Sequence, residues 1–355
     1  MRTARAKQER GATGYYHCIS RVVDRQFVLG PQEKEQLVIL MRRYEAFCGV
    51  KVVTYAMMSN HFHILVEVPP RPEPEDLPSD EQLIALVRKA KDSYGSGTLR
   101  QDLERLRASE ASQAAVEALR ERFFCRMWDV SWFMRLLKQR FTQWFNKGRQ
   151  RCGTLWEDRF KSVLIEGAGE ALSTMAIYID LNAVRAGVVE DPGEYRWCGY
   201  AQGMAGVRAA REGLAIVVAA MRGGGGDDRD GGKSQKLAAQ RVMAEYRLQL
   251  FGRGESRGLT EEGSPMRRGV SEQRIKEVLG KKGRLKKWEA MRCRVRYFSD
   301  GLILGSREFV ERYFKRNRRR FGPKRQSGAR ALRYLELREL FTMRDLQKTP
   351  IGCGN

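Results

Sequence analysis

The chain has 355 residues, of which 42% are hydrophobic and 31% charged, a balance typical of a globular protein with a sizeable core. Lysine and arginine outnumber aspartate and glutamate by 66 to 43, and the formal charge of +23 indicates a polyanionic partner. No apolar run approaches the roughly 20 residues of a spanning helix, and no signal-peptide pattern occurs at residues 1–12. Nucleic acid is therefore favoured over an anionic membrane surface, and a cytoplasmic location is expected.

The cysteines are consistent with that location. All seven are scattered without CxxC spacing, as expected for reduced thiols. With only three histidines, none near two cysteines, a zinc finger is not predicted.

The N-terminal part alternates between strand and helix patterns. Residues 14–23 are rich in aromatic and β-branched side chains and predict a strand. Pro31 opens a helical pattern of apolar residues that extends to residue 47. Residues 52–58 and 61–68 predict two strands joined by a tight turn.

A proline-rich segment then interrupts the pattern, and residues 71–127 are interpreted as a charged, helical insertion. Beyond it, residues 131–147 predict an amphipathic helix, 155–165 a strand and 170–184 another helix. This order predicts an α+β fold, a ferredoxin-like (RRM-like) antiparallel sheet flanked by helices, within a domain spanning 1–200.

The last third of the chain differs in composition from the rest. Residues 201–233 are predicted to be a linker region, Gly-rich at 222–233, and 234–355 a basic, mainly helical region that binds DNA. In residues 311–325, eight of fifteen are Lys or Arg; a solvated basic face is the alternative, and the interleaved aromatic residues could equally anchor the segment. The candidate phosphate-binding residues here are Arg316, Arg318, Arg319, Arg320, Lys324 and Arg325.

Two of the three histidines, His61 and His63, form a His-x-His pair on a predicted strand. Side chains at i and i+2 of a strand point to one face, so both imidazoles could bind one ion while Phe62 faces a core. Alone, the pair also fits two chance surface histidines. His17, on the first predicted strand, is interpreted as a packed histidine.

A second group of residues lies in the helix predicted at 170–184. Tyr178, Asn182 and Arg185 follow i, i+4, i+7 and form a polar stripe beside an apolar face. Alone, such a tyrosine is usually a packing residue with its hydroxyl in water, and Asn182 a helix-end residue.

Together the two groups suggest a chemistry. Two imidazoles and one amide oxygen leave open positions on a divalent ion for phosphate oxygens. Such an ion would neutralise charge on a scissile phosphate, and a tyrosine nucleophile can form a covalent phosphodiester that conserves the bond for rejoining. The hypothesised roles are Tyr178 as nucleophile, His61, His63 and Asn182 as ligands of Mg²⁺ or Mn²⁺, and Arg185 as a DNA contact.

Several segments resemble one family. HFHILVEV (61–68) resembles the His-hydrophobic-His signature of HUH endonucleases, and YIDLNAVRAGVVEDPGEYRWCGY (178–200) is similar to the catalytic-tyrosine segment of REP-associated tyrosine transposases, relatives of the IS200-like transposases. The likeness covers most of residues 10–200 except about 71–127. Further blocks in the family's order are 16–29, 52–68 and 139–166.

The resemblance implies a transposase that nicks and rejoins single-stranded DNA beside hairpins, through a 5′-phosphotyrosine and with a divalent metal ion. Tyr178 matches the nucleophile, His61 and His63 two ligands, and Asn182 the position of a third polar ligand; Ala183 replaces a frequent proline. The implied partner is single-stranded or hairpin DNA, with nucleoid association and no membrane; monomer and homodimer stay open.

Two other functions remain open. One is a non-catalytic or domesticated protein of the same fold that binds single-stranded nucleic acid by stacking bases on aromatic residues. The other is a metal hydrolase that uses water, which would bring more carboxylates to the ion; Glu67 and Asp180 are the near candidates.

Overall fold

The computed structural model describes residues 5–90, 93–108, 113–223, 233–251, 287–291, 293–333, 335–337, 339–343 and 351–352. Within the linker region predicted at 201–233, residues 224–232 of its Gly-rich part lie outside these residues, as does the stretch 252–286. Within the described part, no helix is both long and apolar enough to span a bilayer.

Four strands form the centre of the fold, and each pairs antiparallel with its neighbours in the order β2-β3-β1-β4. With a helix between β1 and β2 and another between β3 and β4, this is the ferredoxin-like arrangement, so the predicted α+β class is confirmed. The strands are β1 (Gly14–Arg21), β2 (Lys51–Met57), β3 (His61–Val68) and β4 (Lys161–Ile165).

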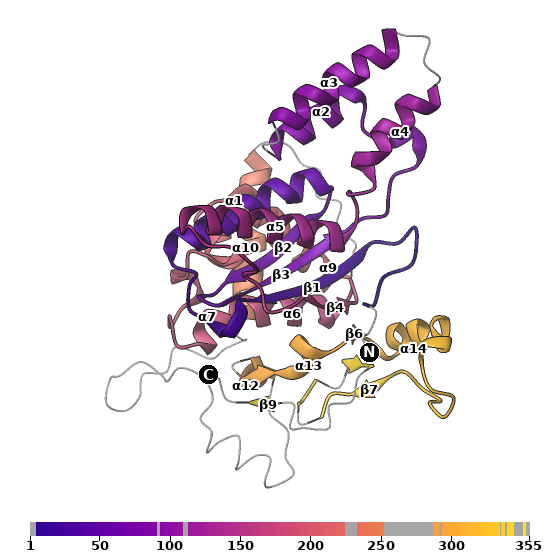
Figure 1. The fold of residues 1–355 in the computed structure, drawn as a ribbon. Helices are drawn as coiled ribbons and strands as arrows, with labels where there is room; N and C mark the ends of the chain where they lie inside the picture. Colours follow the sequence, from indigo (N-terminus) through magenta and orange to yellow (C-terminus); the bar gives the residue numbers. More distant parts are fainter. Residues whose placement is uncertain are drawn as a thin grey trace.

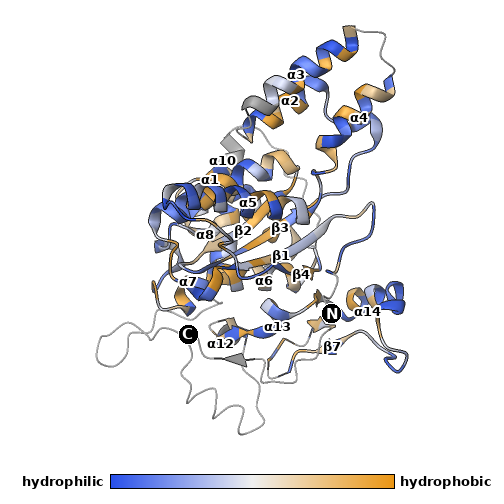
Figure 2. Ribbon diagram, viewed as in Figure 1, coloured by the Kyte–Doolittle hydropathy of each residue, from blue (hydrophilic) through white to orange (hydrophobic). Residues whose placement is uncertain are grey.

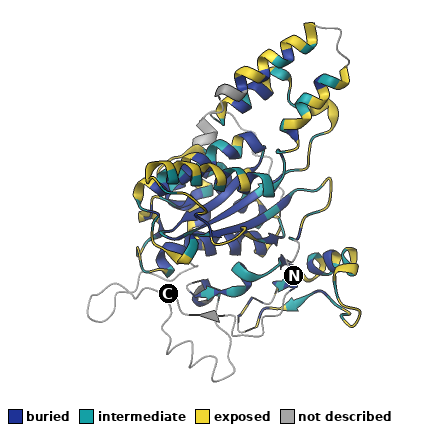
Figure 3. Ribbon diagram, in the orientation of Figure 1, coloured by how far each residue is buried: buried dark blue, intermediate teal, exposed yellow. Residues whose placement is uncertain are grey.

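Helices cover both faces of this sheet, and its strands are buried between them (Figures 1 and 3). One face packs against α1 (Pro31–Cys48) and α5 (Val130–Gly148). The helices on the other face are α6 (Glu170–Asp180), α7 (Asn182–Arg185), α8 (Gly199–Met204) and α9 (Arg208–Met221).

Local sequence explains where the first-face helices begin and end. Pro31 occupies the first turn of α1, where its missing N–H costs nothing, and Gly49 ends that helix at a φ of 61°. Asp129 caps α5 by accepting from the backbone N–H groups of Ser131 and Trp132.

The predicted insertion is helical and forms an arm that projects from the sheet (Figure 1). Its helices are α2 (Asp80–Lys89), α3 (Ser93–Ala108) and α4 (Gln113–Phe124), and we call them the helical arm. Apolar stripes alternate with hydrophilic ones along it, and Leu83 and Leu103 are among its buried residues (Figure 2). Residues 71–127 hold ten basic and eleven acidic residues, so the arm is almost neutral in a strongly basic chain.

The C-terminal region continues the same sheet. Strand β6 (Ile303–Gly305) pairs parallel with β4, and β8 (Phe341–Thr342) and β7 (Arg330–Ala331) follow it. The sequence predicts an independent region tethered by a linker, but the β4–β6 pairing makes this part an extension of the central sheet. No strand pattern is visible in the sequence here, because each strand is only two or three residues long.

The remaining C-terminal elements are short, apart from α10, which packs on α9. They are α10 (Lys233–Phe251), α12 (Lys287–Met291), β5 (Arg294–Val295), α13 (Arg296–Asp300), α14 (Arg307–Arg316) and β9 (Ile351–Gly352).

Candidate active site

The His-x-His pair lies on the sheet face that α6 covers. The rings of His61 and His63 are 5.0 Å apart between centroids. Phe62 is fully buried on the opposite face, where its ring packs edge-on against Trp156 at 5.3 Å. Strand alternation therefore places the histidines on the sheet face opposite Phe62, as the sequence predicts.

His17 is part of this group rather than only a packed histidine. It is fully buried on β1, and its Nε2 lies 2.8 Å from Nδ1 of His63, with the two rings stacked. Its Nδ1 lies 2.8 Å from the carbonyl oxygen of Phe298, on α13. Cross-strand register explains the contact, since β1 pairs with β3 and places His17 opposite Leu65, diagonal to His63.

All three imidazoles are in surroundings that favour the neutral form. Burial lowers the pKa of His17 to about 4 and that of His61 to about 3, and it holds the pKa of His63 well below its ordinary value. The guanidinium of Arg185 lowers all three pKa values further. Neutral imidazole has a lone pair for a metal ion, so the rings suit a ligand role at neutral pH.

Asn60 fixes the orientation of His61. Its amide nitrogen donates to the Arg25 carbonyl at 3.0 Å, so the amide oxygen is the atom that faces His61 Nδ1, at 2.6 Å. An oxygen can only accept there, so Nδ1 of His61 carries the proton and its Nε2 carries the lone pair. The residues present therefore fit a divalent cation held by imidazole nitrogen.

Tyr178 lies beside the histidines, although it comes from a distant segment. It is 3% exposed, and its ring packs edge-on against Phe298 at 4.9 Å and His17 at 6.4 Å. The guanidinium of Arg185 covers the ring at 3.8 Å and donates to the Met291 carbonyl at 3.0 Å. Arg185 is therefore half-buried against the tyrosine, a different position from a surface phosphate contact.

Asn182 lies one turn beyond Tyr178. The chain changes from α6 to α7 at Leu181, but hydrogen bonds from Leu181 to Ile177 and from Arg185 to Leu181 preserve the helical spacing. Asn182 is buried. In the described part of the chain, no three His, Cys, Asp or Glu side chains gather as a metal site.

The two carboxylates that the sequence suggests as ligands, Asp180 and Glu67, form hydrogen bonds with other residues. Asp180 accepts hydrogen bonds from the Thr54 hydroxyl at 2.7 Å, the Tyr246 hydroxyl at 2.6 Å and the backbone N–H of Tyr200 at 3.2 Å. Glu67 accepts from a tyrosine hydroxyl at the other end of β3. Both carboxylates are therefore hydrogen-bonded to other groups of the fold.

Asp180 leads to a stability prediction. Burial raises its pKa to about 6, so between about pH 4 and pH 6 the folded state holds a proton that the unfolded state has lost. The contribution of Asp180 to stability therefore falls as pH rises through this window, by up to about 1.4 kcal/mol per pH unit. In Asp180→Asn this slope should vanish.

Urea unfolding at pH 4.5 to 7 would measure the free energy of unfolding of the unsubstituted protein and of the variant. The difference between the two isolates the pH dependence due to Asp180, because the opposite contribution of the histidines is the same in both proteins. Asp76→Asn, at an exposed position, is the control. Parallel curves for Asp180→Asn and the unsubstituted protein would contradict a raised pKa.

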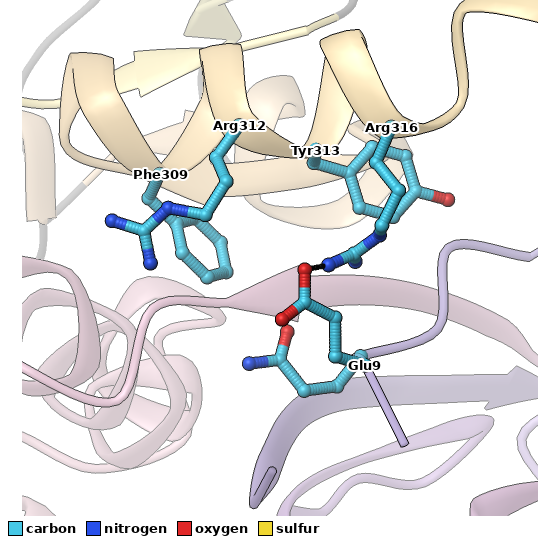
Figure 4. A pocket seen from close by; sticks show the side chains of 6 residues that line it. Glu9, Phe309, Arg312, Tyr313 and Arg316 are labelled. Carbon is cyan, nitrogen blue, oxygen red and sulfur yellow. Dashed lines mark ion pairs between the residues drawn. The ribbon is translucent and has the colours of Figure 1, made fainter. Parts of the chain in front are cut away.

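The predicted basic segment divides into two groups. Arg318 and Arg325 donate to backbone carbonyls of their own loop, and Arg316 pairs with Glu9 (Figure 4). Tyr313 and Phe314 are buried, which makes these interleaved aromatics anchors to the core rather than surfaces for stacking bases. The helix also ends at Arg316 rather than running through the segment.

The exposed cations lie on and after α14. Arg316 is exposed as well as paired with Glu9. Outside that pair, the exposed cations of residues 311–325 are Arg312, Lys315, Arg319, Arg320 and Lys324, and we call them the α14 basic surface. At its edge, Arg312 and Arg316 line a small pocket with aromatic residues of α14 (Figure 4).

Comparison with known proteins identifies a family that resembles the N-terminal part of the chain. Residues 12–78, which hold β1, α1, β2 and β3 with both His-x-His residues, match the family model described as "Transposase IS200 like". No curated protein matches the chain. A similar solved structure is described as "Structure of the REP associates tyrosine transposase bound to a REP hairpin", with 14% identity, a TM-score of 0.37, and coverage of 58% of this chain and 86% of that one. Residues 12–78 are therefore similar to the IS200-like transposase domain, over about a fifth of the chain.

Proposed function

We propose that this protein nicks and rejoins single-stranded DNA through a covalent link between Tyr178 and a 5′ phosphate. The observation that carries the proposal is that Tyr178 from α6 packs edge-on against His17, whose ring stacks on His63 of the His-x-His pair, although the tyrosine comes more than a hundred residues later in the chain. The segment that matches the family model contains all three histidines, and the ring contact between Tyr178 and His17 supports a shared site.

The chain's own groups account for the chemistry. The Tyr178 oxygen would attack the phosphorus and lose its proton, the bond from phosphorus to the 3′ oxygen would break, and that oxygen would take up a proton to leave as a hydroxyl. A divalent ion held by His61, His63 and Asn182 would neutralise charge on the phosphate. Arg185 holds the tyrosine ring from its face and adds positive charge beside the reaction. Reversal of the attack rejoins the strand.

The test is formation of a covalent adduct. The protein is incubated with Mg²⁺ or Mn²⁺ and a labelled DNA hairpin with single-stranded flanks, and a denaturing gel is examined for the fragment on the 3′ side of the nick, linked to the protein through its 5′ phosphate. An adduct and a free 3′ hydroxyl are expected. If the protein binds the strand but never forms an adduct under any tested metal or sequence, the non-catalytic binding protein becomes the better description.

The α14 basic surface is proposed to contact DNA phosphates. The triple variant Lys315→Ala, Arg319→Ala, Lys324→Ala should weaken binding, because fewer cations then neutralise the strand. The negative slope of log K against log salt should become shallower by about 0.7 for each phosphate of a single strand that is no longer neutralised. Binding titrations from about 50 to about 300 mM salt would measure both effects.

The helical arm supplies a matched control, because Arg88→Ala, Lys89→Ala, Arg105→Ala removes three exposed charges from a nearly neutral segment. Equal effects from both triples would assign the α14 basic surface to general solvation. Substitution is preferable to truncation before α10, which would also remove Phe298 from Tyr178.

A further inference from the structure

A chain of hydrogen-bonding groups runs from the C-terminal region into the candidate metal site. The Phe298 carbonyl oxygen lies 2.8 Å from Nδ1 of His17, and Nε2 of His17 lies 2.8 Å from Nδ1 of His63. His17 is fully buried and His63 is 5% exposed, so water does not compete at these contacts. The chain ends at Nε2 of His63.

The chemistry of the first group sets the direction of the whole chain. A carbonyl oxygen only accepts, so Nδ1 of His17 carries the proton. In neutral His17 the other nitrogen then has the lone pair and must accept from His63. Nδ1 of His63 therefore carries a proton, and Nε2 of His63 is left with the lone pair.

We propose that His17 is a positioning residue that holds His63 in the Nδ1–H tautomer and presents its Nε2 to a divalent cation. The proposal rests on the proposed function, in which His63 is a metal ligand. His17 itself is not a ligand in this arrangement, because both of its nitrogens are used. Asn60 imposes the same tautomer on His61, so both imidazoles would offer the same nitrogen.

Three substitutions test separately the hydrogen bond of His17 to the Phe298 carbonyl and its hydrogen bond with His63. In His17→Gln the amide oxygen reaches the position of Nε2 and can accept from His63. In His17→Asn the shorter amide reaches the position of Nδ1 and can donate only to the Phe298 carbonyl. His17→Leu removes both bonds. Phe298→Leu is a matched control that changes the side chain against Tyr178 but keeps the carbonyl.

The experiment uses protein labelled with ¹⁵N-histidine, in which only three imidazoles contribute signals. Imidazole nitrogen shifts should show the Nδ1–H tautomer of His63 in the unsubstituted protein, His17→Gln and Phe298→Leu, and a tautomer mixture in His17→Asn and His17→Leu. Mn²⁺ affinity, measured without DNA by electron paramagnetic resonance, should fall about 10–100-fold in the Asn and Leu variants and stay close to the original in the Gln variant.

Urea unfolding of each variant separates positioning from stability. If Mn²⁺ affinity follows stability, with Gln and Asn equally impaired, His17 is only structural and the proposal is wrong. An unchanged His63 tautomer in His17→Leu would also overturn it. A different result, Mn²⁺ binding with the expected tautomers but no DNA adduct, would leave this inference intact and reject the proposed function.

Discussion

Tyr178→Phe should abolish the protein–DNA adduct and reduce nicking by about 10³-fold or more, because the substitution removes only the attacking oxygen. The ring packs against Phe298, His17 and Arg185 through its carbon atoms, so the fold and DNA affinity should be retained. Adduct formation on denaturing gels and binding by fluorescence anisotropy would measure the two effects separately.

Tyr200→Phe is the matched control. Tyr200 is 1% exposed and belongs to the same core cluster, yet its side chain lies on α8 rather than against the histidines. This variant should nick like the unsubstituted protein. Nicking by Tyr178→Phe at a comparable rate would show that another group is the nucleophile.

Replacement of His61 and His63 by alanine should reduce cleavage by at least about 10²-fold, since charge on the scissile phosphate would be left without a bound cation. Chelator should have the same effect on the unsubstituted protein, and added Mn²⁺ or Mg²⁺ should reverse it. Asn182→Ala should have a smaller effect, because water can replace an amide oxygen. Cleavage rates at a series of Mn²⁺ concentrations would measure each loss.

Phe62→Leu tests the opposite face of the same strand. Its ring is buried against Trp156, so the substitution should lower the free energy of unfolding by about 1–2 kcal/mol and leave metal dependence unchanged. Full activity of the double histidine variant in chelator would make the histidines structural.

The sequence was sufficient to predict which side chains share a face where the placement follows from the regular period of a strand or a helix. Alternation along β3 placed His61 and His63 on one face, and the helical spacing of Tyr178 and Arg185 predicted their shared side. His17 was missed as a site residue because its role depends on the pairing of β1 with β3 and on the Phe298 carbonyl, neither of which is a local property.

The C-terminal region was harder to predict for a similar reason. Its cations stood out as a cluster, but which of them are exposed depends on loops in which Arg318 and Arg325 bind backbone carbonyls. Strand β6 has three residues, and only its pairing with β4 reveals it. Composition shows the charge of such a segment, whereas tertiary contacts decide which charges face solvent.

The contact between Phe298 and Tyr178 has a consequence for biosynthesis. Phe298 follows the tyrosine by 120 positions in the chain, so a ribosome completes α6 well before it makes the residue that packs on the tyrosine and hydrogen-bonds His17. A nascent chain that has emerged only to residue 200 holds both histidines and the tyrosine without this support. The candidate active site would therefore reach its final form late in translation, so that the proposed activity of Tyr178 would depend on completion of the polypeptide.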